Sequence, residues 1–107
     1  MLVLFTPEFP ASFNRMSSAD QALAKPIFKK MRAHLKAVPA PLGFQALPYT
    51  TELLSQNALF LSLTKQVPLA PEDKVFSITD GQFIVFFTVN LNTQHILAFW
   101  CISRKII

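Results

Sequence analysis

The last third of the chain consists of three apolar runs separated by two short polar segments. We predict three consecutive antiparallel strands from these runs, over Lys74–Thr79, Gln82–Val89 and His95–Ser103. Asp80-Gly81 joins the first two runs, and this dipeptide is a strong hairpin signal because both residues tolerate a positive φ. Residues 90–94 (Asn-Leu-Asn-Thr-Gln) form the second, longer turn. This meander constrains the fold more than any other stretch of the sequence.

The middle run is apolar on both faces of the predicted strand. Successive side chains along a strand point to opposite faces. One face would carry Phe83, Val85, Phe87 and Val89, and the other would carry Ile84 and Phe86. A strand that is buried on both faces belongs at the centre of a sheet, with other elements packed over it. We therefore expect residues 82–89 to form the central strand.

The N-terminal third predicts a short strand and two helices. Leu2–Phe5 is a short apolar run and is predicted as an edge strand. Thr6-Pro7-Glu8 is typical of a helix start with Thr6 as the N-cap, and Pro10 limits this helix to a short one. A second helix is predicted from Ser17 to about Ala37, and Pro26 either kinks it or marks the start of its main part. Its buried face, at three-to-four spacing, would comprise Leu23, Ala24, Ile27, Phe28, Met31, Leu35 and Val38.

The middle of the chain connects these helices to the meander. Pro39–Gly43 ends the second helix, as Pro and Gly do after a periodic stretch. Thr50–Gln56 is compatible with a helical turn, and Ala58–Leu63 is predicted as a further strand. At 107 residues the chain fits one domain, residues 1–107. The predicted class is α+β, with an N-terminal short strand and two helices packed on an antiparallel sheet of about four strands.

Positive charge is concentrated in the N-terminal helical region. The net charge is +4, and residues 1–38 carry six basic side chains against two acidic ones. On the second predicted helix, four basic residues fall within about 60° of each other on the polar side. These residues, the basic stripe, are Lys25, Lys29, Arg32 and Lys36. The stripe is either a contact strip for nucleic-acid phosphates or the solvated face of an amphipathic helix.

Several common kinds of site are excluded by composition and spacing. Two glycines are too few for a phosphate-binding loop, and one Cys with two distant His gives no zinc spacing, so no metal or other cofactor is expected. Cys101 and His95 lie on one predicted strand about 20 Å apart, too far to pair as nucleophile and base. We therefore interpret Cys101 as a small apolar core residue.

The apolar composition raises the question of a membrane span, because the mean hydropathy is +0.37. The longest apolar candidate, Phe83–Ile102, is interrupted by polar residues between positions 90 and 95. The first apolar residues are too few for a secretion signal, and a single Cys fits a reducing compartment. We expect a cytoplasmic protein without membrane contact.

Four short motifs along residues 20–103 resemble those of one known family. Val38–Gly43 followed by Tyr49 resembles its Leu-Pro-x-x-Phe-Gly followed by a Tyr, and Phe76–Asp80 resembles its Phe-x-Arg-Thr-Ser/Asn-Asp. Phe83–Phe86 resembles its His-Leu-Val-Tyr, and Ile96–Phe99 resembles its Leu-Leu-Ile-Ala-Ile-Leu strand. With this order of elements, the chain resembles the RelE/ParE-type toxin fold. Within that group it is most similar to the YafO family of toxin–antitoxin mRNA interferases.

The sequence departs from the family pattern at polar positions. Ile78, Phe83 and Phe86 stand where the family has an Arg, a His and a Tyr, respectively. Residues 60–62 (Phe-Leu-Ser) correspond to a His-x-His strand of the family. Thr79 and Asp80 keep the family residue types, and Tyr49 is a further candidate for a retained residue.

The resemblance implies a type II toxin that inhibits translation as a ribosome-dependent, metal-independent mRNA endonuclease. The implied partners are a cognate antitoxin, the ribosome and mRNA. The candidate catalytic residues are then Thr79 and the cations of the sheet: Lys74, Arg104 and Lys105. The basic stripe would dock on ribosomal RNA. Alternatively, Arg104 and Lys105 only solubilise the chain end.

Two other functions remain open at this point. One is a toxin-fold protein without catalysis that acts by binding a protein, as ParE-like members do with gyrase. The other is an inactive interaction domain, for which the missing polar residues are the argument.

Overall fold

The computed structural model describes residues 2–37, 50–53, 56–69, 74–90, 93 and 95–104. In chain order the elements are β1 (Leu2–Phe5), α1 (Glu8–Asn14), α2 (Ser18–Lys36), β2 (Thr50–Leu53), α3 (Ala58–Thr64), β3 (Val75–Asp80), β4 (Phe83–Asn90) and β5 (His95–Ser103). The predicted α+β class is confirmed, and the three strands of the C-terminal meander are confirmed to within one residue at their ends.

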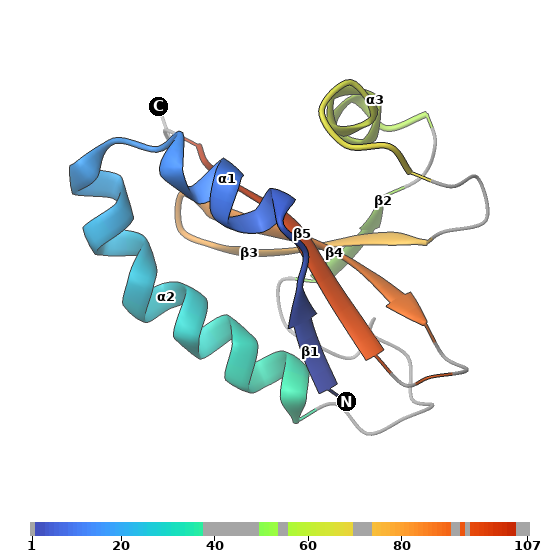
Figure 1. Ribbon diagram of the computed structural model, residues 1–107, viewed down its shortest axis with the longest axis horizontal. Helices are drawn as coiled ribbons and strands as arrows, with labels where there is room; N and C mark the ends of the chain where they lie inside the picture. Colours follow the sequence, from blue (N-terminus) through green and yellow to red (C-terminus); the bar gives the residue numbers. More distant parts are fainter. Residues whose placement is uncertain are drawn as a thin grey trace.

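The strands form one sheet in the order β1-β5-β4-β3-β2. β1 runs parallel to β5, and the remaining neighbours are antiparallel, so the sheet is mixed rather than purely antiparallel. β4 lies at the centre and β1 at an edge, as the sequence predicts. Figure 1 shows α2 along one side of the sheet and α3 on the other.

Two hydrophobic cores lie on the two faces of the sheet. The core beneath α1 and α2 contains Val3, Met31, Leu35, Phe76, Ile78, Val85, Phe87, Ile96, Ala98 and Cys101. The core beneath α3 contains Leu53, Leu63, Val67, Val75, Ile84, Phe86, Phe99 and Trp100. Alternate residues of β4 thus enter opposite cores, which is why this strand has apolar side chains in both directions.

A β-bulge in β5 changes the direction of its side chains. Phe86 pairs with Trp100, but the next residue, Phe87, pairs with Ala98, so Phe99 is an extra residue on β5. Phe99 and Trp100 both enter the core beneath α3, whereas Ala98 and Cys101 enter the other. Strict alternation would have placed Cys101 on the face opposite to Ala98.

The β3–β4 hairpin turns one residue later than the sequence predicts. Asp80 is the last residue of β3 and pairs with Phe83, so the loop residues are Gly81 and Gln82. Gly81 has a φ of 60°, a conformation that disfavours residues with a Cβ. The Asp-Gly signal therefore located the hairpin correctly, with Asp80 in the strand instead of in the turn.

The strand predicted over Ala58–Leu63 is wrong, because these residues form α3. The Asn57 side chain caps the helix by accepting a hydrogen bond from the Leu59 backbone N–H at 2.8 Å. Leu59 and Leu63, four residues apart, face the core, while Leu61 is 52% exposed. A strand would have placed all three leucines on one face, whereas a helix separates Leu61 from the other two.

The helical turn suggested for residues 50–56 is also wrong over Thr50–Leu53, which form β2. This segment pairs antiparallel with β3, from Thr50 opposite Ile78 to Leu53 opposite Val75. Pairing satisfies the backbone groups at the outer edge of β3, and the β-branched Thr residues favour a strand.

The two N-terminal helices follow the prediction with two corrections. The second helix starts where the sequence predicts: Ser17 is its N-cap, and the helix continues through Pro26. The N-cap of α1 is Pro7 and not Thr6, and no side-chain hydrogen bond caps this helix. Leu23 is 58% exposed, although it was placed on the buried face of α2. No helix among the described residues has the length and apolar character needed to cross a bilayer.

We expect Phe87→Ala to lower the free energy of unfolding by about 3–5 kcal/mol, because it removes a fully buried ring from the central strand. Leu23→Ala, at an exposed position, should change it by no more than about 0.5 kcal/mol. Urea unfolding followed by circular dichroism measures both values. Equal effects of the two substitutions would contradict the central placement of β4.

Candidate functional site

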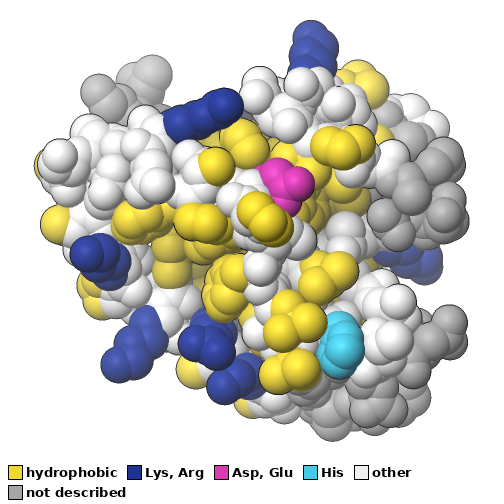
Figure 2. Space-filling view, in the orientation of Figure 1, with side chains coloured by type: hydrophobic (Ala, Val, Ile, Leu, Met, Phe, Trp, Pro, Cys, Tyr) yellow, Lys and Arg dark blue, Asp and Glu magenta, His cyan; other side chains and the backbone are white. Residues whose placement is uncertain are grey.

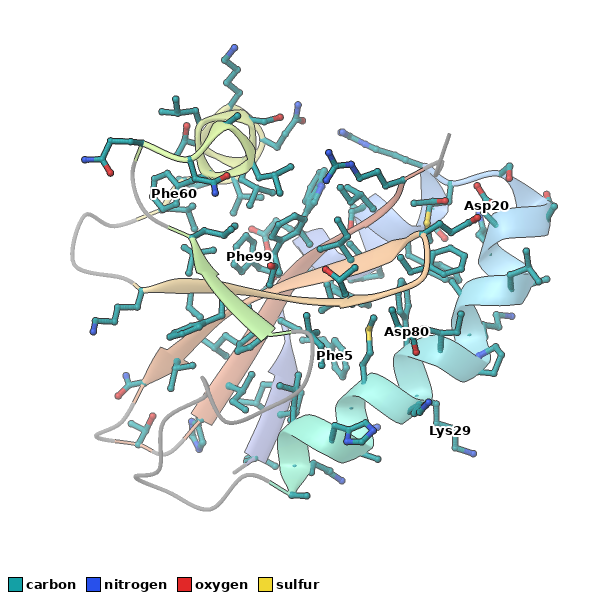
Figure 3. The ribbon with its side chains drawn as sticks, turned by 180° about the vertical axis from the view of Figure 1, so that it is seen from behind. Phe5, Asp20, Lys29, Phe60, Asp80 and Phe99 are labelled. Atoms are coloured by element: carbon teal, nitrogen blue, oxygen red, sulfur yellow. The ribbon has the colours of Figure 1, made fainter. Side chains whose placement is uncertain are left out.

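A cleft of about 460 Å³ opens between α1, the start of α2, α3 and the C-terminal half of β5. We call it the Arg15 cleft. Its polar lining comprises Ser12, Arg15, Ser17, Asp20, Ser62, Gln66 and Ser103. Its apolar lining comprises Met16, Leu59, Leu63, Phe86, Trp100, Cys101 and Ile102. Figure 3 shows Asp20 on the first turn of α2 and Phe99 between the sheet and α3.

Arg15 joins the two sides of this cleft. It lies at the C-cap of α1, and its Nη1 donates a hydrogen bond to Gln66 Oε1, just beyond α3, at 3.2 Å. The guanidinium carbon lies 5.2 Å from the centroid of the Trp100 ring, within the range of a cation–π interaction. The site therefore combines an exposed guanidinium with a largely buried indole ring beneath it, and the guanidinium suits a phosphate group.

Gln82 ties the rim of the cleft together. Its Nε2 donates to Asp20 Oδ1 at 3.1 Å and to Ser103 Oγ at 3.0 Å. Its backbone carbonyl oxygen accepts from the Arg104 N–H. These bonds hold three segments together: the start of α2, the β3–β4 turn and the end of β5. The Asp20 carboxylate and the Arg104 backbone are thereby both bonded to Gln82.

A buried hydroxyl–thiol pair lies at the base of the cleft. Ser12 Oγ donates to the Phe9 carbonyl oxygen at 2.7 Å, accepts from the Cys101 N–H at 3.0 Å, and lies 3.4 Å from Cys101 Sγ. Burial raises the pKa of the Cys101 thiol, and the hydrogen bond to Ser12 opposes this only in part. The thiol is therefore protonated at neutral pH, which agrees with the interpretation of Cys101 as a core residue.

Two of the candidate catalytic residues lie at the same end of the sheet, outside the lining of the cleft. Thr79 is half-buried near the turn end of β3, and Arg104 is exposed after β5 at the same end of the sheet. Lys74 is exposed at the other end of β3, roughly 16 Å from Thr79 at the rise of a strand. Lys105 lies outside the described residues, as does Tyr49.

The basic stripe lies on α2, and each of its four residues is exposed. Figure 2 shows basic side chains spaced along this helix, and Figure 3 shows Lys29 directed away from the sheet. The Arg32 guanidinium carbon lies 5.6 Å from the centroid of the Phe5 ring, so the stripe adjoins β1. The cleft and the stripe are thus separate features of the surface.

The sequence prediction missed Arg15 and Trp100, the residues on which the cleft depends. Neither residue belongs to a sequence motif, and no regular spacing relates positions 15, 66 and 100. Among the described residues, no three His, Cys, Asp or Glu side chains come together as a metal-binding group.

Comparison with known proteins gives a structural match. No protein-family model and no curated protein matches the chain. Among solved structures, the chain is similar to one from the archaeal RelE–RelB complex of Pyrococcus horikoshii OT3. The TM-score is 0.58 at 13% sequence identity, and the match covers 99% of this chain and 97% of that one. The protein therefore has a RelE-like fold.

We expect Ser12→Ala to lower the free energy of unfolding by about 1–3 kcal/mol, because the buried Cys101 N–H loses its acceptor. Ser18→Ala removes a hydroxyl at an exposed position and is the matched control. Urea denaturation at pH 7 compares the two. A Ser12→Ala protein as stable as the control would contradict a stabilising hydrogen bond between Ser12 and Cys101.

The raised pKa of Cys101 predicts a stability change at alkaline pH. The unfolded thiol ionises above about pH 8.5 while the folded thiol stays protonated. Burial of the neutral Cys101 thiol contributes fully to stability below the pKa of the unfolded thiol. This contribution is lost as the pH rises from there through the pKa of the folded thiol. Between pH 7 and about 10, wild-type protein should therefore lose more stability than Cys101→Ala. Parallel pH profiles for the two proteins would contradict the prediction.

Proposed function

We propose that the protein is the toxin of a type II toxin–antitoxin system and that it inhibits translation by cleaving mRNA on the ribosome. The observation that carries this proposal is the Arg15 cleft, which places a guanidinium, a carboxylate and an indole ring in one cleft of a RelE-like fold. A cognate antitoxin is the proposed partner, because the similar solved structure is a RelE–RelB complex. The cytoplasm is the proposed location.

The chemistry is attack of an RNA 2′-oxygen on the adjacent phosphorus. A new O2′–P bond forms, the P–O5′ bond breaks, and the product carries a cyclic phosphate. Arg15 and Arg104 would stabilise the negative charge that develops on the phosphate oxygens, with Lys105 beside Arg104 in the sequence. The Asp20 carboxylate would accept the proton of the 2′-hydroxyl, and the leaving 5′-oxygen would take a proton from solvent at the open cleft.

The other candidate residues take supporting roles in this proposal. The Thr79 hydroxyl, near the same end of the sheet, would donate a hydrogen bond to a phosphate oxygen. Lys74, at the far end of β3, would contact a flanking phosphate of the mRNA. The basic stripe, Lys25, Lys29, Arg32 and Lys36, would dock on ribosomal RNA through its phosphates.

One observation favours the two non-catalytic alternatives, a toxin-fold protein that acts by binding a protein and an inactive interaction domain. Ile78, Phe83 and Phe86 occupy the positions of the polar residues in the resembling family, and each of the three is buried, with at most 4% of its surface exposed. Ile78 and Phe83 do not line the Arg15 cleft, and Phe86 adds only an apolar side chain to its lining, so none of the three offers a polar group to a substrate. Any catalysis must therefore depend on residues outside these positions, which is the role assigned to the cleft.

We expect induction of the wild-type protein to stop growth and to produce cuts in translated mRNA, detected by primer extension. Arg15→Ala and Arg104→Ala should each reduce cleavage at least about 100-fold, because each removes a cation from the developing phosphate charge. A reporter mRNA whose start codon is removed should remain uncut.

The control is Lys30→Ala, which removes a positive charge from an exposed position of α2 outside the stripe and the cleft. It should cut mRNA like the wild type. Growth arrest without cuts would replace the proposal with the protein-binding toxin, and the absence of arrest would leave an inactive interaction domain. Cleavage that survives both arginine substitutions would refute the assignment of the cleft.

A further inference from the structure

The edge strand β1 exposes an unusual amount of apolar surface. Leu2 is 50% exposed, Leu4 is 39% exposed and Phe5 is 45% exposed. They account for three of the five large hydrophobic side chains that are exposed among the described residues. In Figure 2, hydrophobic side chains gather over β1 beside the basic side chains of α2. Clustered apolar side chains on a sheet edge are typical of an interaction site.

The backbone of β1 has hydrogen-bonding groups directed away from the sheet. The Thr6 N–H donates to the Ala98 carbonyl oxygen of β5, so even-numbered residues of β1 direct their backbone groups toward β5. The N–H and C=O of Val3 and Phe5 therefore point outward, because the direction alternates along a strand. Within the described part of the chain, no other strand pairs with this edge. A further strand can therefore form hydrogen bonds with Val3 and Phe5.

The two sides of this edge differ in chemistry. Val3 and Phe5 pair with Ile96 and Ala98, which belong to the core beneath α2. On that side the Arg32 guanidinium covers the Phe5 ring, and the rest of the basic stripe continues along α2. Leu2 and Leu4 point to the opposite side, which α3 does not cover at these positions. One side of the edge is therefore cationic and the other is apolar.

We propose that β1 is the docking site for an extended polypeptide segment in which acidic and apolar residues alternate. The segment adds a sixth strand to the sheet through the backbone groups of Val3 and Phe5. Its apolar side chains cover Leu2 and Leu4, and its carboxylates face Arg32 and the neighbouring cations of α2. We expect the antitoxin to supply a segment with this alternation of acidic and apolar residues. The docking proposal rests on the proposed function only for the identity of this partner.

Charge excludes a second copy of the chain as the preferred occupant. Two copies that pair through β1 would bring their α2 helices to the same edge, each with an exposed basic stripe. Like charges placed side by side oppose association, whereas an acidic segment is attracted. The basic stripe therefore selects an acidic partner over self-association.

The test measures binding of a fluorescein-labelled synthetic peptide, with Glu alternating with Val, to the full-length protein by fluorescence anisotropy at low salt. The peptide should bind in a saturable way, and Arg32→Glu should weaken binding at least about fivefold. Lys30→Glu, an equal charge reversal at an exposed position outside the stripe, should bind within about twofold of wild type. Hydrogen exchange should show that the amides of Val3 and Phe5 become protected when the peptide is bound.

Two further peptides separate strand addition from nonspecific attraction. One has Lys in place of Glu, and the other is N-methylated at alternate residues and so cannot form the ladder. Neither should bind, and equal binding of the N-methylated peptide would overturn strand addition. If the Val3 and Phe5 amides become protected from hydrogen exchange at higher protein concentration without any peptide, the occupant of the β1 edge is a second copy of the chain and the proposal is overturned. None of these measurements involves RNA. A peptide that does not bind therefore leaves the mRNA-cleavage proposal unaffected, and an absence of mRNA cleavage leaves the docking proposal unaffected.

Discussion

The burial of β4 on both of its faces is the constraint on which the rest of the structure depends. Phe83, Phe86 and Phe87 are nearly inaccessible to solvent, and their rings require cover from two directions. The helices α1 and α2 supply it on one face, and α3 supplies it on the other. The bulge at Phe99 then turns Trp100 toward α3 and Cys101 toward α1. The cleft is formed where these two residues meet the helix ends.

The two proposed functional surfaces lie where this packing ends. At the hairpin end, the short α1 terminates at Arg15, whose guanidinium reaches Trp100 and Gln66 across the cleft. At the β1 edge, the sheet stops without a neighbour among the described residues, and the cations of α2 line one side. The first surface suits an RNA phosphate and the second an acidic strand. The proposed function, a toxin regulated by a bound antitoxin, requires both kinds of surface.

Much of the fold could be predicted because its signals are local. The Asp80-Gly81 turn and the apolar run after it specify the meander without reference to any other part of the chain. The prediction for residues 58–63 was wrong because a short apolar run fits both the strand period and the helix period. Only the Asn57 cap favours the helix. The cleft could not be predicted, because Arg15 and Trp100 meet only after a one-residue bulge reverses the end of β5.

The fluorescence of Trp100, the single tryptophan of the chain, tests the central claim most directly. Titration with a short single-stranded RNA at low salt should change its emission in a saturable way, because the indole lies in the cleft against Arg15. The change should disappear in Arg15→Ala and persist when the basic stripe is neutralised, although at higher RNA concentration. RNA that binds, by an independent assay, without any change in Trp100 emission would contradict the account.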